Sequence, residues 1–346
     1  MTRALPSTLK QALDPAWLTE ALTPVGFKAR VSAVETVEIL RTVATKVRFK
    51  ARFEDGSEGA FCLKAYLDLE AGTNQSNITS VREADFYNLL ASKVTVRTPE
   101  CVTAPVDREA QIGVVIMRDL IASGARFCTA LEPFNADRAA RSLEQLARLH
   151  MSHQTLGPIE NLTWLPRQIE WLAQGTYTGP EALQALMNGP RGVGLPDRTR
   201  NAALLIQALK ALAVVDAQRP PSLIHGDCHA GNIFETAEGT GLIDWQLLQQ
   251  GGWALDIVYH ISAVLSVETA EREERALLGH YLETIRRLGG TPPDPEEAWL
   301  QYRQSAVYGF YLWAITRKVD PPIINAFVNR LGSAVTRHDS FRLLGL

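Results

Sequence analysis

The sequence lacks the cysteine pattern of a disulfide framework or of a metal-binding module. Its four cysteines are scattered, and no two of them form a CxxC pair: they are Cys62, Cys101, Cys128 and Cys228. Scattered thiols are typical of a reducing compartment. We therefore expect a cytoplasmic protein.

Long apolar runs and an excess of one charge are missing as well. Residues 1–18 contain no apolar segment of the secretory kind, and the longest uncharged apolar stretches, 257–267 and 305–316, are too short to span a bilayer. The formal net charge is only −3, which provides no basic field for nucleic acid or an anionic membrane. We expect a soluble protein with no membrane span and no nucleic-acid partner.

What the sequence does contain is one stretch, residues 222–246, that concentrates chemistry-bearing side chains: SLIHGDCHAGNIFETAEGTGLIDWQ. If 233–234 and 242–243 are the arms of an antiparallel hairpin closed by a turn over 235–241, Asn232 and Asp244 face one another. An amide oxygen and a carboxylate are hard ligands that suit Mg²⁺. Asp227, five residues before Asn232, would then lie where an attacking hydroxyl donates its proton.

The order of these residues matches a kinase template, in which a catalytic-loop Asp is followed by an Asn five residues on and by a later metal-binding Asp. HGDCHAGN, residues 225–232, resembles the HGDxHxxN loop of the aminoglycoside phosphotransferase and choline kinase superfamily, and IDWQ, residues 243–246, resembles its ecdysteroid-kinase-like branch. The resemblance implies a bilobal protein-kinase-like α+β fold with ATP and Mg²⁺ as cofactors. It makes Asp227 catalytic and Asn232 and Asp244 metal ligands.

Two other interpretations of this stretch stay open. Taken singly, Asp227 and Asn232 are also common turn or cap residues. A transition-metal site is a second alternative, because His225, Asp227, Cys228 and His229 are all possible ligands, and it would make the protein a metal-dependent hydrolase. Neighbours in an extended loop point different ways, however, and no second His/Cys pair has ligand spacing.

Strand patterns dominate the amino-terminal part after a polar lead-in to about residue 30, which contains one short helix over 14–22. Residues 31–40, 45–53 and 59–67 predict three antiparallel strands. Lys64 lies inside an apolar segment of the third, where an ammonium needs an anion. By resemblance it holds the nucleotide α/β-phosphates; the alternative is a surface lysine on an edge strand.

A helix is expected from about Ser80, after a polar loop over residues 73–79. Glu83 in its first turn has two interpretations. By resemblance it pairs with Lys64, and the segment RExxFYNLL favours this; alternatively Ser80 and Glu83 form a capping box.

Residues 102–105 and 112–117 predict the last two strands, followed by Leu120 at the lobe junction, where the resemblance places adenine-binding main chain. Arg118 stands where the family usually has Glu. The phosphate-covering loop falls at residues 40–45 and contains no glycine, which normally permits close approach to phosphate. Either hydroxyls such as that of Thr42 replace it, or binding is weak and the protein is a pseudokinase.

The rest of the chain is expected to be helical. Helices are predicted over 137–153, 180–187, 201–216, 270–288 and 296–331, the last broken at Pro321. His150 and His153 are expected to pack in the core, and Asp256 by resemblance accepts hydrogen bonds from the catalytic-loop backbone. An aromatic group either fills the core or forms a substrate surface: Tyr302, Tyr308, Phe310, Tyr311 and Trp313.

We therefore predict a small nucleotide-binding lobe with an antiparallel sheet, residues 1–118, and a large helical lobe with the catalytic loop and acceptor pocket, residues 119–346. The expected function is ATP- and Mg²⁺-dependent phosphorylation of a hydroxyl on a small molecule. Mixed charges after residue 150 favour a bulky apolar alcohol over a polycationic sugar. The competing function is nucleotide binding without turnover.

Overall fold

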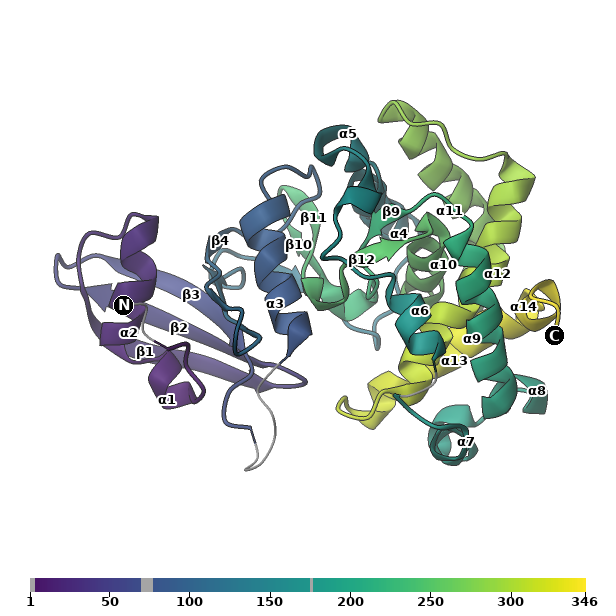
Figure 1. Ribbon diagram of the computed structural model, residues 1–346, viewed down its shortest axis with the longest axis horizontal. Coiled ribbons are helices and arrows are strands. Elements are labelled where there is room, and N and C mark those ends of the chain that lie inside the picture. The colour runs from purple at the N-terminus through teal and green to yellow at the C-terminus, as the bar shows by residue number, and fades with distance from the viewer. Residues whose placement is uncertain (1–3, 70–76, 175–176) are drawn as a thin grey trace. The chain divides into compact units, whose positions relative to one another are not determined.

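The computed structural model describes residues 4–69, 77–174 and 177–346. Residues 73–76 of the expected polar loop lie outside this part. The chain forms two compact units (Figure 1). The first comprises Met1–Lys93, Thr98–Arg126 and Ile243–Leu247, and the second comprises Val94–Arg97, Phe127–Leu242 and Leu248–Leu346. The first is rich in strands and the second is mainly helical, as the α+β prediction requires.

The first unit is built on a five-stranded antiparallel sheet in the order β1-β2-β3-β7-β4. Its strands are β1 Val31–Arg41, β2 Thr45–Phe53, β3 Glu58–Ala65, β7 Val115–Arg118 and β4 Cys101–Thr103. A small ladder joins β5 Val106–Asp107 to β6 Ile112–Gly113. Alternation along β2 buries Val47, Phe49 and Ala51 and leaves Lys46 and Arg48 on the other face. The three predicted strands are confirmed.

The amino-terminal lead-in contributes to the core of this unit, which its polar composition did not predict. It forms α1 Leu9–Ala12, α2 Pro15–Leu22 and η1 Thr23–Val25 (Figure 1). Asp14 caps α2 by accepting the N–H groups of Ala16 and Trp17. Trp17, Leu18 and Leu22 are buried in one cluster with side chains of the sheet.

The helix that carries Glu83 begins earlier than predicted. It comprises α3 Ile78–Asp85 and the π-helical turn η2 Phe86–Leu90. Asn77 is its cap, because its side chain accepts the N–H of Thr79. Glu83 therefore lies in the second turn, and the alternative of a capping box with Ser80 is wrong.

Helices make up most of the second unit (Figure 1). They are α4 Ala136–His150, α5 His153–Leu156, η3 Ile159–Asn161, α6 Gln168–Ala173, α7 Pro180–Asn188, η4 Pro190–Gly192, α8 Asp197–Arg200, α9 Ala202–Ala217, α10 Trp253–Val264, α11 Val267–Arg287, α12 Pro295–Ile315, α13 Pro321–Arg337 and α14 Ser340–Leu343. The predicted break at Pro321 separates α12 from α13. The five aromatic side chains of α12 that the sequence analysis singled out are buried, so they belong to the core: Tyr302, Tyr308, Phe310, Tyr311 and Trp313.

Short strands position the segment that contains the candidate site. β9 Ser222–Ile224 pairs with β12 Gln249–Gly251, and β10 Ile233–Thr236 pairs with β11 Gly239–Leu242. β8 Arg126–Phe127 completes a three-stranded sheet with β10 and β11. The hairpin thus has longer arms and a tighter turn than predicted, since Thr236 already pairs with Gly239. The facing of Asn232 and Asp244 stays a prediction.

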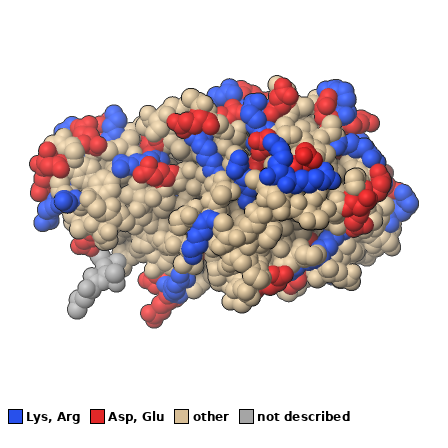
Figure 2. Space-filling view, turned by 90° about the horizontal axis from the view of Figure 1, so that it is seen from above, with Lys and Arg blue, Asp and Glu red and all other residues tan. Residues whose placement is uncertain are grey.

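The surface carries charges of both signs. On the face shown in Figure 2, basic and acidic side chains are interspersed. Within the described ranges, no helix is long and apolar enough to cross a membrane.

Candidate active site

Lys64 is a buried cation of the first unit. It lies on β3, an interior strand, and only 4% of its side chain is exposed, so the alternative of an edge-strand surface lysine is wrong. Its Nζ lies 2.8 Å from Glu83 Oε2 and 2.7 Å from Asp244 Oδ1. The structure therefore places three of the predicted residues together.

The two carboxylates stabilise the charged form of Lys64. Burial by itself would lower the pKa of Lys64, but the carboxylates of Asp244 and Glu83 raise it above the ordinary value. Lys64 is thus an ammonium at any working pH. It provides a fixed positive charge beside two carboxylates.

Glu83 is linked to Asp244 through Lys64 and to the next residue, Trp245, through a backbone hydrogen bond. Asp244 has a φ of 69°, a left-handed conformation that Asp adopts more readily than most residues. The N–H of Trp245 donates to Glu83 Oε1 over 3.3 Å, and its indole stacks on Phe86 with ring centroids 3.9 Å apart. Glu83 therefore orients Lys64 and the main chain next to Asp244.

Lys46 is a residue of this group that the sequence analysis missed. It pairs with Lys64 in the β2–β3 register, and its Nζ lies 3.6 Å from Asp244 Oδ2. The alternation of β2 already places Lys46 on the polar face of the strand. Its position beside Lys64 follows only from the register between β2 and β3, which the sequence does not give. Two ammonium groups thus approach the two oxygens of one carboxylate.

The turn between β1 and β2 occupies residues 42–44, within the predicted phosphate loop, and contains no glycine. The hydroxyl of Thr42 donates to the C=O of Ala44 over 3.1 Å, so it closes the turn. Thr45, the other candidate hydroxyl, is buried. A compact turn without glycine therefore occupies the position where the family resemblance implies a glycine-containing phosphate loop.

Leu120 follows β7. Its C=O accepts the N–H groups of Ser123 and Ala125. Binding of adenine by the main chain of Leu120 stays a prediction. The guanidinium of Arg118, the departure from the family pattern, lies over the rings of Phe27 and Phe61 at 5.4 and 5.2 Å. This side chain is therefore occupied with packing against aromatic rings.

In the second unit, Asp256 of α10 holds the loop that carries Asp227. Its carboxylate accepts the N–H of His225 at 2.7 Å, the N–H of Gly226 at 2.9 Å and Nε2 of His150 at 3.1 Å. Burial by itself would raise the pKa of Asp256, but the hydrogen bond and charge of His150 and the loop N–H groups lower it. The geometry is that of the structural acceptor expected from the resemblance, with His150 in the core.

Asn232 ends the short helical turn η5 Ala230–Asn232. Its Nδ2 donates to the C=O of Asp227 over 2.8 Å. A carbonyl only accepts, so the amide nitrogen must point to Asp227. The amide oxygen is then the atom that Asn232 has for a cation.

The side chain of Cys228 lies in the core of the second unit. Its side chain is buried, its Sγ donates to the C=O of Asp256 over 3.2 Å, and burial raises its pKa well above the ordinary value. Among residues 4–69, 77–174 and 177–346, no three His, Cys, Asp or Glu side chains group as a metal site. The thiol is therefore a protonated core side chain.

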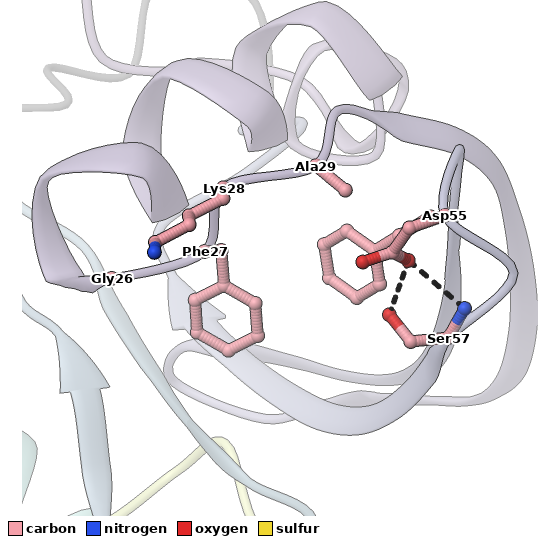
Figure 3. A pocket seen from close by; sticks show the side chains of 7 residues that line it. Gly26, Phe27, Lys28, Ala29, Asp55 and Ser57 are labelled. Carbon is pink, nitrogen blue, oxygen red and sulfur yellow. Dashed lines mark hydrogen bonds between the residues drawn. The ribbon is translucent and has the colours of Figure 1, made fainter.

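A small pocket on the first unit lies apart from these residues. Figure 3 shows that it is formed by residues 26–29 and by the turn after β2, where Asp55 accepts hydrogen bonds from the hydroxyl and N–H of Ser57. None of the candidate site residues lines it.

Comparison with known proteins identifies the family. The sequence profile of the phosphotransferase enzyme family, APH, matches residues 52–296. The chain belongs to this family. The predicted superfamily is thereby confirmed, whereas the ecdysteroid-kinase-like branch stays a prediction.

Individual phosphotransferases are more distant. A thiamine kinase of Escherichia coli K12 is 31% identical over 110 residues, which are 31% of this chain and 36% of that protein. The chain therefore matches only about a third of that relative's length.

Solved structures show the fold of this phosphotransferase. A microcompartment-associated aminopropanol kinase has a TM-score of 0.56 at 17% identity, covering 94% of this chain and 98% of its own. A putative fructosamine-3-kinase of Thermobifida fusca has a TM-score of 0.52 at 16% identity, with the same coverage. These likenesses confirm the predicted kinase-like α+β fold.

Cys228→Ala tests whether the thiol takes part in function. We expect the variant to keep most of whatever phosphoryl transfer the wild type shows and its melting temperature within a few degrees of the wild type, because a small buried side chain with one weak hydrogen bond is removed. The measurements are activity and thermal unfolding. Loss of activity in a folded variant would revive the metal-site interpretation.

His260 predicts how stability depends on pH. Its Nδ1 donates to the C=O of Cys228, and its Nε2 accepts from Ser142, both over 2.7 Å. Burial lowers its pKa from 6.5 to about 4. Between these values only the unfolded chain takes up the proton, so the stabilisation is complete above pH 6.5 and is lost as pH falls toward 4.

Acidification from pH 7 to pH 5 should therefore cost about 2 kcal/mol through this one histidine. His260→Gln can keep both hydrogen bonds and does not titrate. Urea unfolding at the two pH values should give a smaller loss in the variant by about that amount. Equal losses in both proteins would contradict the assignment.

Proposed function

We propose that the protein is an ATP- and Mg²⁺-dependent phosphotransferase that acts on a hydroxyl group of a small molecule. The observation that carries the proposal is the buried Lys64 ammonium held between Glu83 and Asp244 in a member of the phosphotransferase family. Such a fixed positive charge suits the α- and β-phosphates of a nucleotide. The N–H of Leu120 would bind the adenine edge.

Lys46 is proposed as a second phosphate ligand. Glycine loops bind phosphate through backbone N–H groups, and the turn between β1 and β2 lacks glycine. Lys46 offers a mobile ammonium near Lys64, as the contact of both with Asp244 indicates. Its charge would compensate for the missing N–H donors.

Asn232 and Asp244 are the proposed Mg²⁺ ligands. The donor set fits the ion, because an amide oxygen and a carboxylate are hard ligands and the amide nitrogen of Asn232 is already engaged. When bound, the ion would offset negative charge on the phosphates. Lys64 and Lys46 hold Asp244 in the structure and would turn toward phosphate oxygens.

Asp227 is the proposed catalytic residue. The acceptor oxygen forms a bond to the γ-phosphorus, the bond from that phosphorus to ADP breaks, and the hydroxyl proton passes to the Asp227 carboxylate. A carboxylate is too weak a base to ionise an alcohol beforehand, so the proton moves late. In a loose transition state, the main contribution of Asp227 is to orient the hydroxyl.

The acceptor we propose is a bulky, largely apolar alcohol. The buried aromatic side chains of α12 do not offer a surface, but Trp171 and Tyr177 are 43% and 62% exposed and pack edge to face. Exposed aromatic rings favour apolar ligands. Related kinases are named for thiamine and aminopropanol, which supports a hydroxyl group on a small molecule but not its apolar character.

Nucleotide binding without turnover is the second candidate function. The turn without glycine favours it, because fewer backbone donors would hold the γ-phosphate in line for transfer. The two functions differ in whether transfer depends on Asp227.

Asp227→Asn and Asp244→Ala should differ in kind. The first should keep binding of ATP with Mg²⁺ and lose transfer by about 10²–10⁴-fold, since it removes the proton acceptor and little else. The second should also lose Mg²⁺-dependent nucleotide affinity. The measurements are an acceptor screen with γ-labelled ATP, with apolar alcohols, kanamycin-like sugars and choline, and calorimetry of nucleotide binding.

Equal transfer by both variants and the wild type would reject the assignment. Mg²⁺-dependent binding with no transfer to any acceptor would instead support the nucleotide-binding protein. Turnover of an aminoglycoside that Asp227→Asn abolishes would overturn only the apolar acceptor.

Lys46→Ala should raise KM for ATP about ten-fold, because a charge-assisted contact with phosphate contributes about 1.5–3 kcal/mol. Lys50→Ala is the matched control, on the same strand and the same face but exposed. The check is initial rates at varied ATP. Similar KM values in the two variants would exclude Lys46 from phosphate binding.

A further inference from the structure

The carboxylate of Asp227 is held by a chain of two buried side chains within the second unit. The hydroxyl of Tyr259, on α10, lies 2.8 Å from Asp227 Oδ1, and Nε1 of Trp313, on α12, lies 2.6 Å from the Tyr259 hydroxyl. Tyr259 is fully buried and Trp313 is 5% exposed. The two helices therefore contribute to one chain of hydrogen bonds, which runs from Trp313 through Tyr259 to one carboxylate oxygen of Asp227.

The chemistry of the three groups fixes the direction of both hydrogen bonds. An indole N–H can only donate, so the oxygen of Tyr259 is its acceptor. The hydroxyl hydrogen of Tyr259 then points to Asp227 Oδ1. Burial and the nearby Asp227 charge raise the pKa of Tyr259 well above its ordinary value, so the phenol keeps this hydrogen throughout the working range.

The position of Tyr259 in α10 adds a second link to the same loop. Asp256, three residues earlier, accepts the N–H groups of His225 and Gly226. One turn of helix thus fixes both the backbone of the loop and the carboxylate that it carries. The other carboxylate oxygen, Oδ2, lies 3.3 Å from Asn232 Nδ2 and 3.7 Å from His229 Nε2.

We propose that Tyr259, itself held by Trp313, is a positioning residue for phosphoryl transfer. It fixes the rotation of the Asp227 carboxylate, so that Oδ2 receives the hydrogen of the acceptor hydroxyl. This inference rests on the proposed function of Asp227. Tyr259 touches neither substrate nor nucleotide and acts through Asp227 alone.

Tyr259→Phe removes the donor and keeps the ring. We expect kcat to fall about 10–100-fold, which corresponds to loss of a hydrogen bond to a charged group. Without the donor the carboxylate takes up a proton more readily, so the acid limb of the kcat/KM profile moves to higher pH. KM for ATP should stay unchanged.

Two further variants separate positioning from a general loss of packing. Trp313→Phe removes the donor to Tyr259 and should shift the acid limb in the same direction by less. Tyr302→Phe is the matched control, because this buried tyrosine of α12 donates to Glu274, over 3.4 Å, instead of to Asp227. Its pH profile should match the wild type.

An NMR measurement tests the contact without an acceptor. In protein labelled with ¹³C at the aspartate carboxyl carbons, the signal missing from Asp227→Asn identifies Asp227. At neutral pH that signal should move in Tyr259→Phe, which loses the donor to Oδ1, and stay in place in Tyr302→Phe. An Asp227 signal at the same position in all three proteins would overturn the inference, as would an unchanged kcat in an active Tyr259→Phe variant.

The two proposals fail in different ways. Absence of transfer by the wild type to every acceptor would count against the proposed function and leave the Asp227 carboxyl signal to decide on Tyr259. If Tyr259→Phe does not fold, as thermal unfolding would show, Trp313→Phe provides the same NMR test.

Discussion

The Lys64 ammonium is the charge on which the first unit depends. A buried cation is tolerated only where anions meet it, and here Glu83 and Asp244 do so from two segments far apart in sequence. This requirement accounts for the inclusion of Ile243–Leu247 in a unit otherwise built from the first third of the chain. It also accounts for the left-handed backbone at Asp244, which brings its carboxylate to the lysine.

In the second unit the corresponding constraint is an anion, the buried carboxylate of Asp256. It is satisfied by N–H donors of the loop and by Nε2 of His150. Donors from the backbone fix a conformation more closely than a flexible side chain does, because they leave few alternatives. The Asp227 loop is therefore shaped before any ligand arrives, and Tyr259 extends the same helix's control from the loop's backbone to its carboxylate.

The features that were predicted correctly from the sequence are those that depend on local residue patterns. Alternation located β2 with both ends, Thr45 and Phe53. The anion requirement showed only that Lys64 needs a partner, and it was the resemblance to the family that named Glu83. The start of α3 was missed because Asn77 and Ser80 are both good caps, and the N–H of Asn77 is fixed by the C=O of Gln111, a contact between distant segments. The contact of Lys46 with Asp244 was missed for a similar reason, since it depends on strand register.

The charges also bear on the choice between the two proposed functions, phosphoryl transfer and nucleotide binding without turnover. A buried ion pair adds little stability over apolar residues of similar size, because desolvation offsets most of the attraction. A cluster of two ammonium groups and two carboxylates is thus poorly explained as a device for folding. It is better explained as a binding site in which the ammonium groups and carboxylates would exchange partners with a bound phosphate and its metal ion. Phosphate binding of this kind depends on the charges and does not need glycine in the neighbouring turn. The hydrogen bond from Tyr259 to Asp227 adds to this argument, because it holds the proposed proton acceptor in one orientation, which transfer requires and nucleotide binding alone does not.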